Sequence, residues 1–506
     1  MRVLFTLIIC LFCAVSIFTQ SPANISSMPR EMRGVWVATV GNIDWPSSPN
    51  LSVASLKREA NKIIADAKSW GLNTIFLQVR PSSDAIYNSS IEPITPYICN
   101  DASLLSQYSS FDALSYWIDK CHENGIELHA WLNPFRVSPS AEYKAMGRHL
   151  ISSHPEWLIS YGGKLYLDPG IPEARRYVLS VVEDIVSRYK VDGVHFDDYF
   201  YPYPVGSEIF GDSLSYERYN VDDLSVADWR RKNVTAVISD VYNYLKSQND
   251  WMKFGVSPFG VWRNASDDVR GSKTRAGITN YDILYADVYD WIQRGIVDYV
   301  VPQIYWEAGN KAADFDELIA WWANMATERT KIYVGHAVFK INAQTGKLWG
   351  TKNEMEEQIV KVRDNEALSG SVFFSYRQFL RQLNGLQGNM SALLYNKFAL
   401  PDIEPSPDTL SVSIVDMKKR GAFIHWSLKN NADSANVRYF IVYRQPKGQD
   451  SEPIRLQNVV GITSNTYWEL HPAISRRDRE RYVYRVSAIL NSRKETGLSE
   501  RIVVKE

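Results

Sequence analysis

Residues 191–202 hold the most reactive cluster of side chains in the sequence. The stretch opens with an expected buried strand, residues 191–196, and continues into two adjacent carboxylates, Asp197 and Asp198, followed by aromatic residues. Barrel enzymes present acids and bases in this way, where a buried strand ends at the barrel mouth. Because alternate strand residues share a face, we expect His195 and Asp197 to face the barrel axis and Asp198 to face away. The structural alternative is that one aspartate caps a helix or pairs with a cation.

Polar and aromatic residues also stand at the ends of the other expected strands. If parallel strands close into a barrel, these ends converge on one site. The residues concerned are Trp36, Gln78, Arg80, Asp84, His129, Trp131, Asn133, Arg136, Tyr199, Ser257, Gln303, Tyr305, Trp306, Glu307 and His336. Glycoside cleavage needs this mixture, since two carboxyl groups flank the bond, amides and arginines hold hydroxyls or an anionic substituent, and rings stack on sugar faces.

Several of these residues also have a purely structural interpretation. Arg80 could brace a loop by pairing with Asp84, and Gln303 could satisfy buried backbone groups. Tyr305 and Trp306 could be packing at the barrel rim. We favour substrate contacts for these five residues because they are expected to converge with the aspartates. We expect the same role for Trp36, Asn133, Arg136, His195, Tyr199 and His336.

Metal-dependent hydrolysis is disfavoured by the histidine content. A hydrolytic zinc barrel needs several histidines at strand ends, whereas the chain has 8 His and no His-x-His after its first expected strand. We therefore assign no metal and no cofactor. His129 is interpreted as a neutral core histidine, and Glu307 has the alternative of a solvated loop charge.

Eight strand-like runs alternate with helix-like runs. The strands are expected at residues 34–40, 73–79, 127–132, 193–196, 253–257, 298–304, 331–334 and 371–374. The helices are expected at residues 55–70, 111–124, 172–189, 226–246, 281–294, 312–325 and 352–365. This count predicts an α/β protein with a (β/α)8 TIM barrel. A doubly wound open sheet should have a Gly-rich phosphate turn after the first strand, and residues 40–46 contain none.

The chain ends suggest export and a second domain. A basic start followed by apolar residues 3–18 predicts a signal peptide over residues 1–22, and hence a periplasmic or cell-envelope protein. Lipid anchoring at Cys13 is the weaker alternative because the bulky Phe12 precedes it. No later run is long and apolar enough to cross a membrane.

After the barrel, expected at residues 30–398, a Pro-rich linker covers residues 399–408 and short alternating strands fill residues 409–506. Trp426 on an early strand, with tyrosines on a late one, resembles a fibronectin type III β-sandwich. We expect this domain to be structural or to tether the protein at the cell surface.

The composition of the chain limits the classes of molecule that it is expected to bind. A net charge of −1 provides no basic field for a phosphate backbone, so nucleic acid is excluded as a partner and a polysaccharide is favoured. Two of the 4 cysteines, Cys99 and Cys121, remain after the signal peptide. They could pair in an oxidising compartment.

Six ordered motifs resemble a known family. They are Arg33-Gly-Val-Trp36, Gln78-Val-Arg-Pro81 with Asp84-Ala-Ile-Tyr87, Ala130-Trp-Leu-Asn-Pro-Phe-Arg136, Leu167-Asp-Pro-Gly170, Asp192-Gly-Val-His-Phe-Asp-Asp-Tyr199 and Pro302-Gln-Ile-Tyr-Trp306. Together they are similar to glycosyl-hydrolase-like family ten, a bacterial group of exported (β/α)8 barrels. The resemblance implies a glycoside hydrolase fold. Some relatives act on peptidoglycan glycan strands that have lost their peptides, and others have no assigned substrate.

The resemblance also implies roles for the acids. In related retaining barrels the nucleophile stands at the end of the fourth strand, with a polar residue two positions before it. Asp197 matches the position of the nucleophile or base, and His195 matches that of the polar residue. Glu307 or Asp198 is expected to be the general acid, and Asp84 remains a further candidate. Rival hypotheses are a non-catalytic glycan-binding barrel and a metal-dependent deacetylase or amidase.

Overall fold

The computed structural model describes residues 30–140, 142–144, 146–147, 149–341, 349, 353–381, 385–401, 412–449, 454, 458–470, 481–491 and 494–503. The expected signal peptide, the alternative anchor Cys13 and most of the expected linker lie outside these residues, so they stay predictions. Among the described residues, no helix is both long and apolar enough to cross a membrane.

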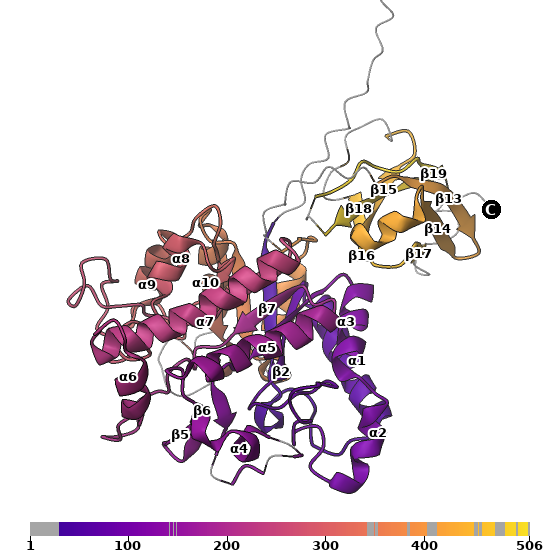
Figure 1. The fold of residues 1–506 in the computed structure, drawn as a ribbon. Coiled ribbons are helices and arrows are strands. Elements are labelled where there is room, and N and C mark those ends of the chain that lie inside the picture. The colour runs from indigo at the N-terminus through magenta and orange to yellow at the C-terminus, as the bar shows by residue number, and fades with distance from the viewer. Residues whose placement is uncertain are drawn as a thin grey trace, which may run out of the picture.

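A parallel sheet forms the centre of the large domain (Figure 1). Its strands are β1 (Met32–Val37), β2 (Thr74–Arg80), β3 (Glu127–Leu132), β7 (Gly193–Phe196), β8 (Lys253–Val256), β9 (Tyr299–Val300), β10 (Lys331–Ile332), β11 (Val334–Ala337) and β12 (Gly370–Phe374). They follow the order β10-β9-β8-β7-β3-β2-β1-β12-β11. Only Tyr333 separates the two end strands β10 and β11 along the chain, so these strands are two parts of one strand and the sheet closes into the expected (β/α)8 barrel.

Strand alternation separates two hydrophobic layers. On β1, Trp36 packs inside the barrel with Phe76, Trp131 and Tyr299. Its neighbour Val35 joins the layer between the sheet and the helices. The inward residues at the carboxyl ends of the strands therefore form the floor of any site at the barrel mouth.

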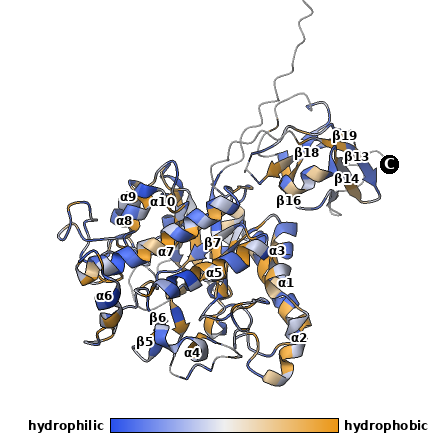
Figure 2. Cartoon of the chain, viewed as in Figure 1, coloured by the Kyte–Doolittle hydropathy of each residue, from blue (hydrophilic) through white to orange (hydrophobic). Residues whose placement is uncertain are grey.

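The surrounding helices are α1 (Val53–Ser69), α2 (Leu105–Ser109), α3 (Ala113–Glu123), α4 (Leu150–Ser153), α5 (Pro172–Arg188), α6 (Ser213–Tyr219), α7 (Val226–Gln248), α8 (Val288–Arg294), α9 (Phe315–Ala323), α10 (Glu354–Arg363), α11 (Tyr376–Phe379) and α12 (Leu386–Asn389). Helix α1 begins after the N-cap Ser52, whose hydroxyl accepts from the Ser55 backbone N–H. Its buried stripe is the one that the sequence pattern predicts: Leu56, Ala60, Ile63, Ile64 and Ala67. Hydrophilic residues interrupt hydrophobic ones along α5 and α7, as expected for helices with one face in solvent (Figure 2).

Two element boundaries differ from the expected ones for physical reasons. The sixth strand stops at Val300 because Pro302 has no N–H for the ladder, and isolated bridges from Gln303 to Phe259 and to Gly335 continue the pairing. The expected helix 281–294 begins only at Val288, where the Asp287 side chain accepts from the Asp290 backbone N–H.

A small antiparallel sheet, which the sequence pattern did not reveal, follows β3. It contains β4 (Arg136–Ser138), β5 (Leu158–Tyr161) and β6 (Lys164–Leu167), in the order β4-β6-β5. Residue Arg136 pairs in register with Tyr166 of β6. This insertion fixes the backbone of one predicted substrate contact beside the barrel mouth.

The C-terminal segment forms two further antiparallel sheets. One contains β13 (Ile414–Arg420), β14 (Phe423–Leu428) and β17 (Tyr467–Glu469), and the other contains β15 (Val437–Pro446), β16 (Val459–Thr463), β18 (Tyr482–Leu490) and β19 (Ile502–Val503). The buried Trp426 of β14 packs against Phe440 of β15, with ring centroids 5.3 Å apart. A two-sheet β domain is therefore present, and its fibronectin type III identity stays a prediction.

The β domain docks on the amino-terminal end of the barrel strands. The buried Arg438 pairs with Glu127 at 3.0 Å and also with Asp192, residues that begin or precede β3 and β7. Figure 1 shows β5, β6 and α4 at the opposite end of the barrel. The docked domain thus leaves the carboxyl ends of the barrel strands uncovered.

The two cysteines that could have formed a disulfide do not pair. Cys99 and Cys121 are both buried free thiols. Burial raises the pKa of the Cys121 thiol well above its ordinary value, so this thiol is uncharged and behaves as a small apolar core group.

Candidate active site

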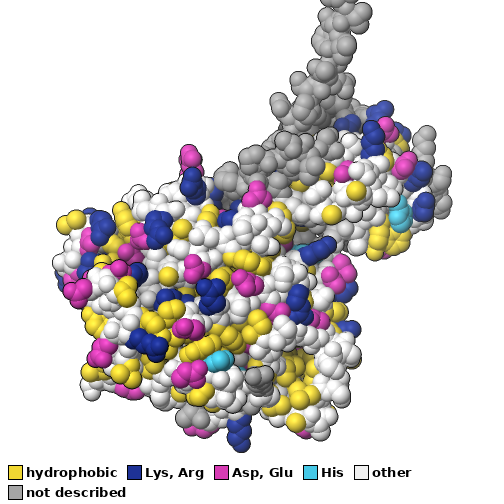
Figure 3. Space-filling view, viewed as in Figure 1, with side chains coloured by type: hydrophobic (Ala, Val, Ile, Leu, Met, Phe, Trp, Pro, Cys, Tyr) yellow, Lys and Arg dark blue, Asp and Glu magenta, His cyan; other side chains and the backbone are white. Residues whose placement is uncertain are grey.

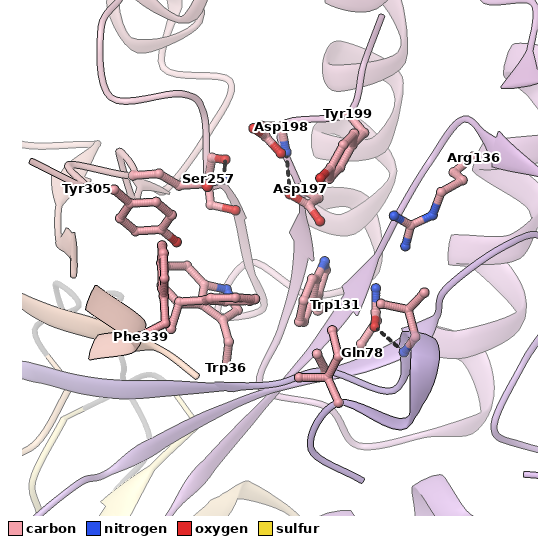
Figure 4. Close-up of a pocket in the computed structure, with 15 residues that line it drawn as sticks. Trp36, Gln78, Trp131, Arg136, Asp197, Asp198, Tyr199, Ser257, Tyr305 and Phe339 are labelled. Carbon is pink, nitrogen blue, oxygen red and sulfur yellow. Dashed lines mark hydrogen bonds between the residues drawn. The ribbon is translucent and has the colours of Figure 1, made fainter. Parts of the chain in front are cut away.

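A cavity of about 250 Å³ opens at the carboxyl ends of the barrel strands (Figure 4). Its lining combines two carboxylates, one guanidinium, two amides and many rings. The lining residues are Trp36, Ala38, Val40, Ile43, Gln78, Trp131, Arg136, Asp197, Asp198, Tyr199, Ser257, Gln303, Tyr305, Phe339 and Phe374. The expected convergence of strand ends is therefore present.

Asp197 lies just beyond β7, and both of its carboxylate oxygens accept hydrogen bonds. Oδ2 accepts from Asn133 Nδ2 at 2.8 Å, and Oδ1 accepts from the backbone N–H of Asp198 at 2.7 Å. Two donors aimed at one carboxyl group fix its rotamer and complement a negative charge on it.

Asp198 also lines the cavity, which corrects the prediction that it faces away. Strand β7 ends at Phe196, so the alternation of faces no longer holds for the two aspartates. The Tyr203 hydroxyl donates to Asp198 Oδ2. Burial first, and then the adjacent charge of Asp197, raise the pKa of Asp198 well above its ordinary value.

Asn133 links Asp197 to the surrounding polar side chains. Its Oδ1 accepts from Gln78 Nε2 at 2.6 Å and from Arg136 Nη2 at 2.9 Å. With these acceptor bonds made, its amide nitrogen is oriented toward Asp197. Asn133 is fully buried, so it positions the reactive carboxylate rather than contacting substrate.

The Arg136 side chain forms part of the cavity wall and is held there by a hydrogen bond. Its Nε donates to the Pro81 carbonyl at 2.9 Å, and its guanidinium lies 5.3 Å from the centre of the Tyr199 ring. Among the described lining residues it is the one cation. It is therefore placed to attract an anionic substituent of a ligand.

His195 lies beneath the cavity rather than in its lining. Its Nε2 lies 3.0 Å from Ser257 Oγ and 3.3 Å from Trp36 Nε1, which donates to it. Its ring stacks on Tyr299, with centroids 5.9 Å apart. Burial lowers the pKa of His195 well below its ordinary value, so it is a neutral support for the floor.

The rings of the cavity come from several strand ends. Trp36, Tyr199 and Tyr305, which were selected from the sequence, all line it, as does Gln303, whose Nε2 donates to the Ser257 carbonyl at 2.9 Å. Burial, followed by the charges of the two aspartates, raises the pKa of Tyr305 well above its ordinary value. The Tyr305 hydroxyl therefore keeps its proton and can donate it in a hydrogen bond.

Arg80 and Asp84 do not line the cavity. A register irregularity between Gln78 and Arg80 turns the end of β2, so Gln78 faces the cavity and Arg80 does not. Arg80 instead forms a buried ion pair with Glu92 at 2.6 Å, a different partner from the expected Asp84. Asp84 accepts from the Ser82 backbone N–H at 3.0 Å and from the Tyr143 hydroxyl. Both side chains brace loops around the site.

Glu307 also lies outside the cavity lining. Its oxygens accept from Asn310 Nδ2 at 3.1 Å and from Trp349 Nε1 at 3.0 Å. Burial acts to raise its pKa, but hydrogen bonds from its own backbone, Asn310 and Trp349 outweigh it, so the pKa of Glu307 is lowered. A group held in its ionised form is a poor proton donor.

Trp306 and His336 are packing residues in this structure. Trp306 stacks edge-on against Phe259, with centroids 5.3 Å apart. His336 is buried, with Nδ1 3.1 Å from Gln358 Oε1 and Nε2 3.0 Å from Ser371 Oγ. Neither contributes to the cavity lining.

Part of the cavity lining was not predicted from the sequence. Gln78, Trp131 and Ser257 stand among the strand-end residues of the sequence but were not chosen as substrate contacts. Phe339 and Phe374 carry no chemical signal in the sequence. Phe339 comes from the short helical turn Val338–Lys340 that follows β11, and only the closed barrel brings it to the site.

No group of three or more His, Cys, Asp or Glu side chains within the described ranges is arranged to hold a metal ion. The cavity itself offers two carboxylates and no histidine in its lining. The absence of a metal requirement stays a prediction.

The closed barrel with paired acids in an aromatic cavity defines a glycoside-hydrolase-type barrel. The chain belongs to the family described as glycosyl hydrolase-like 10, whose model matches residues 31–350. It is 38% identical over 432 residues to glycosyl hydrolase YngK of Bacillus subtilis, covering 83% of this chain and 84% of that protein. It is 39% identical over 342 residues to glycosyl hydrolase DigH of Escherichia coli K12, covering 64% and 76%.

The glycoside hydrolase domain of PgaB from Bordetella bronchiseptica overlays with a TM-score of 0.46 at 14% identity, over 72% of this chain and 99% of that domain. At that level of similarity the overlay says nothing about activity.

Proposed function

We propose that this protein hydrolyses glycosidic bonds of a polysaccharide in the cavity above β7. Asp198 is the general acid, and Asp197 is the ionised carboxylate that stabilises positive charge at the sugar. The observation that supports this most is the pair itself: two adjacent acids line one aromatic cavity, and the pKa of one of them, Asp198, is raised.

The environments of the two acids support this division of roles. A general acid must hold its proton at working pH, and the raised pKa of Asp198 provides that. Asp197 accepts two hydrogen bonds from fixed donors and serves best as an anion. These assignments replace Glu307 as the candidate acid.

We propose peptide-free peptidoglycan glycan strands as the substrate. These strands carry muramic acid, whose lactyl group ends in a carboxylate, and Arg136 offers a cation for it in the cavity. The rings of Trp36, Trp131 and Tyr199 offer apolar faces for sugar stacking. The family resemblance supports the same substrate class, since some relatives act on such strands.

We further propose that the protein is exported and works in the periplasm or cell envelope, with the C-terminal β domain as a tether. Docking through Arg438 at the amino-terminal end of the barrel leaves the cavity accessible to a long glycan. Acidic and basic side chains are intermixed on the face in Figure 3 rather than gathered in a basic patch, which does not favour binding of nucleic acid.

The test is incubation with purified peptide-free strands, with mass spectrometry to detect new reducing ends. We expect Asp197→Asn and Asp198→Asn each to lower turnover by about 100- to 10,000-fold, with unchanged folding by circular dichroism. Glu307→Gln is the matched control and should retain activity. Wild-type turnover in Asp198→Asn, or binding of strands without any cleavage, would contradict the proposal.

A further inference from the structure

We propose that the nucleophile is the substrate's own 2-acetamido group, so that cleavage requires an N-acetylated sugar on the non-reducing side of the broken bond. This inference rests on the proposed function and specifies its substrate class. It follows from where the acids lie and from what faces them.

The two aspartates are too close together to flank an anomeric carbon. Protein-nucleophile and water-attack mechanisms place their two carboxyl groups about 5–5.5 Å and about 6.5–9.5 Å apart, respectively, on opposite sides of the sugar. Here the two acids are adjacent in the chain, the Asp198 backbone N–H donates to Asp197 Oδ1 at 2.7 Å, and both side chains line the same cavity. Both acids therefore approach a sugar from one side.

No other carboxylate lines the described part of the cavity. The remaining candidates, Asp84 and Glu307, are held elsewhere by Tyr143 and by Asn310 with Trp349. The group that attacks from the opposite side must therefore come from the substrate or from an unassisted water molecule. An acetamido oxygen attached to the adjacent carbon is the better positioned of the two.

The cavity has a place for each part of an acetamido group. Asp197 can accept its N–H, and the Tyr305 hydroxyl can donate to its carbonyl oxygen. Figure 4 shows that hydroxyl pointing into the cavity. The methyl group would rest on the rings of Trp36, Phe339 and Phe374. This arrangement holds the amide oxygen near the anomeric carbon.

The steps balance without a co-reactant other than water. Protonated Asp198 gives its proton to the glycosidic oxygen, and the C1–O bond breaks with its electron pair leaving on that oxygen. The acetamido oxygen bonds to C1 as the amide proton shifts to Asp197, giving a bicyclic oxazoline. Water then attacks C1 and loses a proton to Asp198, the ring C1–O bond breaks, and Asp197 returns its proton to the amide nitrogen. The product keeps the original anomeric configuration.

The experiment uses one glycan preparation in four forms: native peptide-free strands, chemically de-N-acetylated strands, and de-N-acetylated strands re-acylated with acetyl or with trifluoroacetyl groups. We expect de-N-acetylation to lower kcat/KM by about 100-fold or more. Re-acetylation should restore the rate. Trifluoroacetylation should not, because that group is nearly the same size but a much weaker nucleophile.

Each result has a distinct meaning. Equal rates on acetyl and trifluoroacetyl strands, or an inverted anomer of the first product by proton NMR, would overturn the inference and leave the proposed function standing. Failure to cleave any of the four forms would overturn the proposed function itself. Asp197→Asn should lose most of its rate on native strands while keeping the wild-type melting temperature within a few degrees, and full activity in that variant would also overturn the inference.

Discussion

Substitution of Asn133 tests whether a buried amide sets the position of the reactive carboxylate. In Asn133→Ala, Asp197 loses the 2.8 Å hydrogen bond to its Oδ2, and Gln78 and Arg136 lose their shared acceptor. A hydrogen bond to a charged group is worth about 1.5–3 kcal/mol. At about 1.36 kcal/mol for each tenfold change, kcat/KM should fall by about 10- to 150-fold. The loss should be mainly in kcat, since Asn133 is absent from the described cavity lining.

The variant Asn133→Asp distinguishes the hydrogen bond that Asn133 donates from those that it accepts. This variant keeps an acceptor for Gln78 and Arg136 but removes the amide donor to Asp197. Near neutral pH the introduced carboxylate also repels Asp197, which lies 2.8 Å from the replaced amide nitrogen, so the variant should be about as inactive as Asn133→Ala. Activity should recover partly at lower pH, where the introduced carboxyl group is protonated and can donate to Asp197 in place of the amide.

The control is Asn310→Ala. Asn310 also donates to a carboxylate, Glu307, at 3.1 Å, but outside the cavity lining. Rates are measured from new reducing ends on peptide-free strands, with thermal unfolding run on every variant. If Asn133→Asp retained wild-type kcat/KM across the pH range, or if Asn310→Ala lost as much rate as Asn133→Ala, the positioning role would be refuted.

Four other predictions concern acids, cations and histidine. Glu307→Gln should keep kcat/KM within about twofold, measured on the same strands, because Glu307 lies outside the cavity lining. Arg80→Met should destabilise the fold by about 3–5 kcal/mol in urea unfolding, because Glu92 is left buried and unpaired, and Arg80→Met with Glu92→Leu should recover most of it. Asp198→Asn should raise the melting temperature increasingly as pH rises above the unfolded-state pKa, because the raised native pKa makes folding less favourable there. Burial lowers the pKa of His336 from 6.5 to about 4, so its stabilisation is complete above pH 6.5 and is lost as pH falls toward 4. His336→Asn should therefore flatten the pH dependence of stability in that window by up to about 3 kcal/mol.

The fold was predictable because its signal is repeated along the chain. Eight strand-like runs with helical stripes between them favour a barrel, whichever individual boundary is wrong. The short β9 shows the limit of such a prediction, since Pro302 ends the backbone ladder although the strand was expected to continue to Ile304. The sheet β4-β6-β5 was missed because its strands are short and lack a sustained alternating pattern.

The location of the site could be predicted from the sequence, whereas the roles of its individual residues were harder to predict. Asp197, Tyr199 and Tyr305 follow directly from the rule that strand ends converge. Arg80 did not follow, because the irregularity after Gln78 cannot be seen in residue types. Asp198 was assigned to the wrong face because the strand ends one residue before Asp197, a boundary that a sequence pattern does not resolve.

The motifs that carry the family resemblance therefore contain two kinds of residue. Some contact the cavity, such as Gln303 and Arg136, whereas others are buried and hold those contacts in place, such as Asn133 and Arg80. Burying the charges of Arg80 and Glu92 costs desolvation free energy. We therefore infer that the position of the loop they hold matters for the site. The guanidinium of Arg80 also donates to the Asn133 carbonyl at 2.6 Å, which links this ion pair to the residue that orients Asp197. We infer that the motif residues on the neighbouring strands β2 and β3, like the acids after β7, serve to hold the carboxylate of Asp197 in position.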